Sequence, residues 1–136
     1  MNGLTIDSSV IISSLIEKEP RHQEALNIWE PVLTGRDFAV MPYSVLVEVV
    51  AAIRRRTGSE ELALEVKQTL LHLDSVSFIV LDEKAAEEAA DLAAKIAVRG
   101  MDALVIQIAR EFGTELISFD NEMMSKAAPM LPTGPR

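Results

Sequence analysis

Residues 45–58, "VLVEVVAAIRRRTG", place one glutamate, Glu48, among apolar side chains that would otherwise read as a buried helix. An isolated carboxylate in apolar surroundings is costly unless it is paired with another group or its pKa shifts. Glu48 therefore either extends along the surface to reach water or has a partner in another part of the chain. Both interpretations are open at this point.

The chain of 136 residues has the length of one domain, and 49% of its residues are hydrophobic, which predicts a folded protein with its own core. It has no cysteine, which excludes disulfides and thiolate metal sites and fits a reducing cytoplasm. We find no signal peptide and no apolar run near the roughly 20 residues that span a bilayer, so we expect a cytoplasmic protein without membrane segments. The net charge of −8 argues against a general nucleic-acid coat. It does not exclude a nucleic-acid enzyme, because metal ions neutralise an acidic site locally.

Short β-like runs alternate with helical patterns, which predicts an α/β fold with a mostly parallel sheet. We expect strands at residues 3–6, 37–41, 76–81 and 115–119. We expect helices at residues 8–19, 20–33, 42–57, 60–72, 83–99, 101–113 and 121–127, with Gly58 ending the third of them and Ser59 capping the fourth. A weak fifth strand is possible around Met130, in a tail that is weakly structured from about residue 128. Without repeats or linkers, residues 1–136 form a single domain.

Helical spacing assigns apolar side chains to the inner faces of these helices. The expected inward-facing residues are Ile11, Ile12, Leu15 and Ile16; Ala25, Leu26, Trp29, Val32 and Leu33; Leu62, Val66 and Leu70; and Met101, Leu104, Val105, Ile108 and Phe112. The alanine-rich helix at residues 83–99 has small side chains that permit close packing against a neighbouring helix.

Four acidic residues fall where a parallel sheet binds its ligands, outside the carboxyl ends of the strands. Asp7 and Asp120 directly follow expected strands, Asp102 lies in the first turn of its helix, and Glu48 lies in the second turn of a helix that follows another strand. Four carboxylates at one sheet edge would repel one another, so a shared divalent cation is the natural resolution. Hard oxygen ligands favour Mg²⁺ or Mn²⁺, and such an ion would be a partner for Glu48.

Each acid also has an ordinary structural interpretation. Asp7 and Asp120 are placed to be helix N-caps, and Asp102 is favoured in a first turn by the helix dipole. Glu48 is placed to reach solvent along the helix surface. Asp82 also follows a strand and precedes a helix, but nothing else singles it out, so we interpret it as a cap and as a control for the other acids.

The segments "TIDSSV", "VLVEVVAAIRR", "GMDALVIQIA" and "LISFDNEM" together resemble the PIN domain family, and especially the short bacterial and archaeal VapC-type toxin ribonucleases. The resemblance runs from residue 4 to about residue 124 in the family's order and spacing. It implies a three-layer α/β fold with a mostly parallel sheet of four or five strands flanked by helices. It also places the family's catalytic, metal-site acids on Asp7, Glu48, Asp102 and Asp120.

The same resemblance assigns supporting roles to Ser8 and Ser118, which would orient ligands or bound water. Ser118 stands where threonine is more usual in the family, and it keeps the hydroxyl. The implied function is a metal-dependent endoribonuclease, the toxin of a type II toxin–antitoxin pair, which hydrolyses RNA with water activated by one or two Mg²⁺ or Mn²⁺ ions. The implied partners are RNA, a small cognate antitoxin and a second copy of the chain.

Other functions were weighed against the residues. A PIN fold that binds or scaffolds with poor catalysis remains an alternative. A haloacid-dehalogenase-type enzyme needs a second aspartate where Ser9 stands, and a receiver domain needs an acidic pair where Asp7 stands alone. His22 and His72 lie in polar helix surroundings and are poor catalytic candidates.

Arginines are the remaining candidates for contacts with RNA or the antitoxin. Arg54 and Arg55 belong to a basic run that ends the helix of Glu48, and Arg55 lies two helical turns after Glu48 on the same face. Arg99 precedes Gly100 near Asp102. The alternative for Arg54 and Arg55 is a solvated helix end favoured by the dipole, and the alternative for Arg99 is a surface role.

Overall fold

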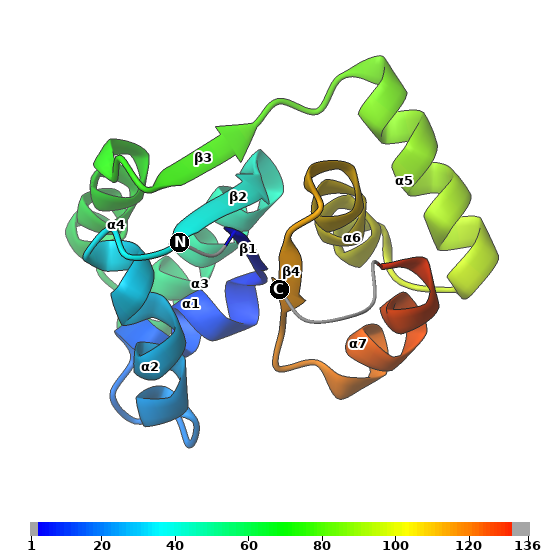
Figure 1. The fold of residues 1–136 in the computed structure, drawn as a ribbon. Helices are drawn as coiled ribbons and strands as arrows, with labels where there is room; N and C mark the ends of the chain where they lie inside the picture. Colours follow the sequence, from blue (N-terminus) through cyan, green and yellow to red (C-terminus); the bar gives the residue numbers. More distant parts are fainter. Residues whose placement is uncertain (1–2, 132–136) are drawn as a thin grey trace.

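A four-stranded parallel sheet in the order β3-β2-β1-β4 lies at the centre of the protein (Figure 1). The computed structural model describes residues 3–131. The strands are β1 (Gly3–Ile6), β2 (Phe38–Pro42), β3 (Val76–Ile79) and β4 (Glu115–Ile117). All three pairings are parallel, and β1 has a neighbour on each side. The predicted α/β fold with a parallel sheet is confirmed.

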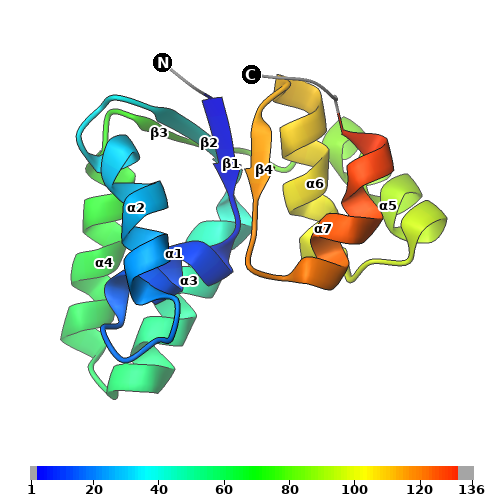
Figure 2. The ribbon, with the colours of Figure 1, turned by 60° about the horizontal axis from the view of Figure 1, so that its bottom comes forward.

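Helices cover both faces of the sheet, as Figure 2 shows. One group contains α1 (Ser8–Leu15), α2 (His22–Leu33), α3 (Tyr43–Thr57) and α4 (Glu60–His72). The other contains α5 (Glu83–Ile96), α6 (Gly100–Phe112) and α7 (Asn121–Ala127), which is followed by a short 3₁₀ helix, η1 (Ala128–Met130). Within residues 3–131, none of the helices has both the length and the apolar character needed to cross a membrane.

Local signals place the helix ends largely as the sequence predicts. Gly58 ends α3 in the left-handed conformation with φ 72°, and the Ser59 hydroxyl accepts a hydrogen bond from the Leu62 N–H at 3.0 Å at the start of α4. The Asp82 carboxylate accepts a hydrogen bond from the Ala85 N–H at 2.8 Å. The interpretation of Asp82 as a helix cap is therefore confirmed.

Several boundaries differ from the prediction, and the strands expected at residues 76–81 and 115–119 already end at Ile79 and Ile117. The helix expected at residues 8–19 ends at Leu15, because Ile16 is already extended, and the next helix begins at His22 instead of Pro20. The helix expected at residues 83–99 ends at Ile96, because Ala97 adopts the left-handed conformation with φ 58°. A strand around Met130 is not formed, since this residue lies in η1; the rest of the predicted loose tail, residues 132–136, lies outside the described residues.

The core differs from the predicted helix faces because small side chains take many of the contact positions. Five side chains expected in the core are 40–46% exposed: Leu15, Leu33, Leu62, Met101 and Phe112. The buried positions of α1 include Ser13 and Ser14, and those of α6 include Ala103 and Ala109. In close helix packing, small residues let the backbones approach, and the larger Leu15, Met101 and Phe112 on the same two helices stay partly exposed. The largest fully buried side chains include Ile6, Ile11, Met41, Ile53 and Ile106.

A buried hydroxyl fixes β1 between its two neighbours. The Thr5 hydroxyl, which is fully buried, donates to the Val40 carbonyl of β2 at 2.8 Å and lies 2.6 Å from the Thr114 hydroxyl, next to β4. A buried hydroxyl with both partners in place favours one strand register over its alternatives, because a shifted register would leave it unpaired. The end of β1 is thereby held beside the end of β4.

Candidate active site

The first acid, Asp7, stands where β1 ends and α1 begins, and it is 8% exposed. Its N–H donates to the Ile117 carbonyl at 2.9 Å, so the carboxyl ends of β1 and β4 are adjacent. The residue occupies the N-cap position of α1, but its side chain makes no capping hydrogen bond there within the described part of the chain. Instead, Oδ2 accepts hydrogen bonds from the hydroxyls of Ser9 at 3.0 Å and Ser118 at 2.8 Å. The interpretation of the Asp7 side chain as a helix cap is therefore wrong.

The two hydroxyls connect Asp7 to the loop that leads into α7. Ser118 accepts a hydrogen bond from the Asp120 N–H at 3.0 Å, and Ser9 accepts one from the Phe119 N–H at 3.2 Å. Each serine therefore joins the carboxylate of Asp7 to the backbone beside Asp120. Sequence reasoning assigned a supporting role to Ser118 but not to Ser9. The available signal was its position in the first turn of α1, two residues after Asp7.

Glu48 lies on α3 and is half-buried, and its electrostatic surroundings show that the acids gather. Burial raises the pKa of Glu48 above its ordinary value, and the negative charge of Asp7 raises it further. A hydrogen bond with the Ser8 side chain acts in the opposite direction, while Asp102 adds a smaller repulsion. Glu48 is therefore neither isolated in the core nor extended away from the other acids.

Asp102 and Asp120 are both paired with one arginine. The Arg99 side chain donates from Nε to Asp102 Oδ2 and from Nη2 to Asp120 Oδ2, each at 3.1 Å. These ion pairs raise the pKa of Arg99 above its ordinary value. The other oxygen of Asp120 accepts a hydrogen bond from the Met123 N–H at 3.0 Å and so caps α7. Asp120 is thus a helix cap and a member of the cluster at the same time.

Two hollows open beside this cluster. One, of about 600 Å³, is lined by Glu48, Arg99 and Asp102 together with alanines on one face of α5. The other, of about 250 Å³, is lined by Arg99, Asp102, Asp120 and Lys126. Arg99 and Asp102 line both, and the Arg99 side chain is 78% exposed. Glu48, Asp102 and Asp120 are therefore accessible to a ligand from solvent.

The donor chemistry fits a divalent cation, because the cluster offers carboxylate oxygens that repel one another and serine hydroxyls that orient them. Across residues 3–131, however, no three acidic or histidine side chains are drawn together as a ready-made metal site. Asp102 and Asp120 are turned to Arg99 in this arrangement. The chain thus has suitable ligands, and an arginine holds two of them.

The other candidates lie apart from this network. Arg54 and Arg55 are exposed in the last turn of α3. The Nδ1 atoms of His22 and His72 are hydrogen-bonded to the carbonyls of Ser13 at 2.8 Å and Gln68 at 2.7 Å, respectively. Both imidazoles are thus engaged with nearby backbone.

The fold and the site define an α/β protein with an acidic cluster at the carboxyl ends of parallel strands. The model of the PIN domain family matches residues 4–128, and the chain belongs to this family. No curated protein sequence matches the chain. Its fold is similar to that in the crystal structure of Mycobacterium tuberculosis VapC20, a toxin that cleaves the sarcin–ricin loop, with a TM-score of 0.77 and 18% identity over 91% of this chain and 94% of VapC20.

The raised pKa of Glu48 predicts how stability depends on pH. A carboxyl group whose pKa is higher in the folded state stabilises the fold fully below its unfolded value, and this stabilisation is lost as pH rises through the folded value. In EDTA at neutral pH, Glu48→Gln should therefore unfold at a higher temperature than the wild type, because it removes a half-buried charge that two other acids repel. The difference in unfolding temperature between the variant and the wild type should become smaller as the pH is lowered to about 4.

Asp82→Asn is the matched control for this measurement, since asparagine also caps helices well. It should leave the melting temperature nearly unchanged at both pH values. A melting temperature for Glu48→Gln below that of the wild type at neutral pH would contradict the prediction.

Proposed function

We propose that this chain is a metal-dependent endoribonuclease. The observation that carries the proposal is the convergence of Asp7, Glu48, Asp102 and Asp120, from four separate elements, on the carboxyl-end edge of the sheet. Membership of the PIN family supports it, as does the fold shared with VapC20, a toxin that cleaves the sarcin–ricin loop. The alternative, a catalytically weak PIN-fold scaffold, predicts the same fold without cleavage.

The four acids would hold Mg²⁺ or Mn²⁺, one ion or two, and such an ion when bound activates water and neutralises charge on a phosphodiester. The chain's own residues prepare the site for this. Ser9 and Ser118 fix the direction of the Asp7 carboxylate, and we assign Ser8 the same task for Glu48. These hydroxyls donate to oxygens that are negatively charged, so they reduce repulsion without adding charge.

Cleavage of a labelled single-stranded or structured RNA should require Mg²⁺ or Mn²⁺ and should stop in excess EDTA. Glu48→Gln should reduce the cleavage rate by about 100- to 1,000-fold, because it removes one negative charge that contributes to stabilising the transition state. Asp82→Asn removes a carboxylate at another strand end and should retain full activity. Robust cleavage in EDTA, or full activity of Glu48→Gln, would reject the assignment; an equal loss in Asp82→Asn would show that the wrong acids were chosen.

Arg99 competes with a divalent cation for Asp102 and Asp120 in this proposal. A planar guanidinium can bond both carboxylates at once, whereas a lysine ammonium is a single point of charge. When a cation takes the two acids, Arg99 is released at an exposed position beside the site. There it is our candidate for contact with an RNA phosphate or with an antitoxin. Arg54 and Arg55, exposed in the last turn of α3 and apart from the acids, are further candidates for such contacts.

Titration calorimetry with Mn²⁺ tests this competition without relying on activity. Arg99→Gln should bind Mn²⁺ about two- to tenfold more tightly than the wild type, since exposed ion pairs contribute modestly. The Mn²⁺ affinity of Arg99→Lys should lie between that of the wild type and that of Arg99→Gln. Arg110→Gln removes the same charge from the last turn of α6 and should leave the Mn²⁺ affinity unchanged. Unchanged or weaker Mn²⁺ binding by Arg99→Gln would refute the competition.

Exposed apolar side chains support the proposed partners. Leu15, Leu33 and Leu62, which sequence analysis assigned to the core, line one groove of about 370 Å³ between α1, α2 and α4. We assign this groove to an apolar segment of a cognate antitoxin, in a cytoplasmic toxin–antitoxin pair. Tyr43, Val80 and Leu81 line a second, smaller hollow of about 50 Å³, which we assign to a second copy of the chain.

Charge substitutions separate the two surfaces. Leu81→Glu should convert a dimer to a monomer in light scattering, while Leu33→Glu should leave the dimer intact and abolish capture of the small protein encoded by the adjacent reading frame. A wild-type chain that is monomeric at high micromolar concentration would contradict the dimer. If the Leu33→Glu variant still captures that small protein, the groove between α1, α2 and α4 is not the antitoxin interface.

A further inference from the structure

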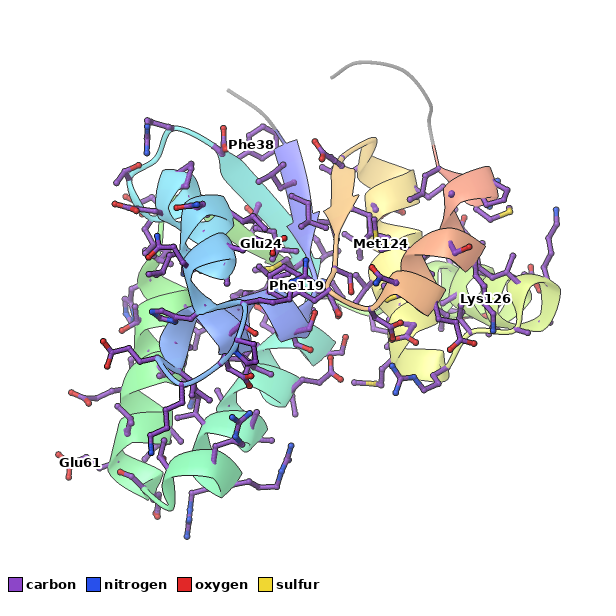
Figure 3. All side chains as sticks on the ribbon, turned by 90° about the horizontal axis from the view of Figure 1, so that it is seen from below. Glu24, Phe38, Glu61, Phe119, Met124 and Lys126 are labelled. Atoms are coloured by element: carbon purple, nitrogen blue, oxygen red, sulfur yellow. The ribbon has the colours of Figure 1, made fainter. Side chains whose placement is uncertain are left out.

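Arg21 forms a planar stack with Phe119 on the rim of the site. Its guanidinium carbon lies 3.7 Å from the centroid of the Phe119 ring. The edge of the same guanidinium bonds Glu24, from Nε at 3.0 Å and from Nη2 at 2.6 Å. Figure 3 shows Glu24 and Phe119 close together near the middle of the molecule. The stack joins the start of α2 to the loop between β4 and α7.

The stack is attached to the acid cluster through the backbone. Phe119 directly precedes Asp120, and its N–H donates to the Ser9 hydroxyl, which in turn donates to Asp7. The backbone that carries the ring therefore cannot move far without disturbing the bonds that orient Asp7. A ligand that lies on the stack would be next to any phosphodiester at the acids.

The arginine of this stack is poorly suited to hold a phosphate. Its charge is balanced by Glu24, and two of its N–H groups are already used. Its side chain is nevertheless 43% exposed, so the ring covers one face of the guanidinium while solvent reaches the side chain. What remains is a flat, oriented surface whose net charge is small. Unpaired nucleobases stack on aromatic rings and on guanidinium planes of this kind.

We propose that the Arg21–Phe119 stack binds one unpaired nucleobase of the RNA substrate, next to the bond that is cut. This inference rests on the proposed function and adds to it a requirement for a single-stranded or looped substrate. The competing explanation is that the stack only fastens the start of α2 to the loop before α7. The two explanations differ in what happens to RNA affinity when the protein remains folded.

The test measures fluorescence anisotropy of a 5′-labelled single-stranded RNA in Mg²⁺, with every protein carrying Glu48→Gln to suppress cleavage. Arg21→Ala and Phe119→Leu should weaken binding on the order of five- to thirtyfold, the range expected for loss of one stacked base. Arg21→Lys should weaken it similarly, because lysine keeps the charge but not the plane. Phe119→Tyr should bind as the parent does, and so should Arg36→Ala, which changes an exposed arginine outside the stack.

Salt dependence separates stacking from phosphate contact. Loss of a stacked base should leave the slope of log affinity against log salt unchanged, whereas loss of a phosphate contact lowers that slope by about 1. A set of RNAs with a single abasic site, moved through the sequence, adds a second test. At one position, the abasic site should lower the RNA affinity of the parent protein. The same abasic site should cause no further loss of affinity in Arg21→Ala.

Each outcome has a defined meaning. Unchanged RNA affinity in folded Arg21→Ala and Phe119→Leu, with only a lower melting temperature, would show a structural fastening and overturn the proposal. A reduced salt slope in Arg21→Ala would assign a phosphate contact and also overturn it. If the wild type cleaves RNA in either case, the proposed function stands alone; if the wild type neither binds nor cleaves RNA, both fail.

Discussion

The parallel pairing of β1 with β4 is the constraint on which the site depends. The two strands are more than a hundred residues apart in the sequence, yet their carboxyl ends lie side by side. Leu4 is opposite Glu115, and Ile6 is opposite Ile117. Two hydroxyls, from Thr5 and Thr114, meet in the buried interior beside this pairing. Because side chains alternate along a strand, a shift of one residue would turn Thr5 away from its partners and place Ile6 on the opposite face of the sheet. The register that buries the core is therefore the same register that brings Asp7 beside Asp120.

Bringing the acids together costs electrostatic free energy, and the chain offsets this cost in two different ways. On one side, Asp7 and Glu48 are bonded by neutral hydroxyls from Ser8, Ser9 and Ser118. On the other side, Asp102 and Asp120 are bonded by a full positive charge on Arg99. A hydroxyl can stay in place when a cation arrives, since it repels no cation. A guanidinium at the same oxygens would have to give way, so in the proposed function the two halves of the site would respond differently to a metal ion.

The sequence could predict the elements and the position of the four acids near one edge of the sheet, because both depend largely on local patterns. Alternating strands and helices, the position of Asp7 and Asp120 directly after strands, and the caps at Ser59 and Asp82 are all encoded within a few residues. The buried faces of α1 and α6 were harder to predict. The spacing rule assigns the most hydrophobic side chains to the core, whereas close packing on these helices buries serine and alanine. The stack of Arg21 on Phe119 could not be found from sequence, since it joins residues almost a hundred positions apart and has no spacing rule.

The acidity of the chain also bears on the proposed binding of RNA. With a net charge of −8, long-range attraction to a polyanion is absent, so affinity has to come from short-range contacts beside the acids. A bound cation changes the sign of the potential only in its own neighbourhood. Arg99, once released from Asp102 and Asp120, would add positive charge at that place, while the Arg21–Phe119 stack, balanced by Glu24, would add flat surface without charge. Recognition would then depend on a metal ion, one mobile arginine and one stacked base acting within a small area. Such a site selects an RNA that can present an unpaired nucleotide to it, which a uniformly paired duplex cannot do.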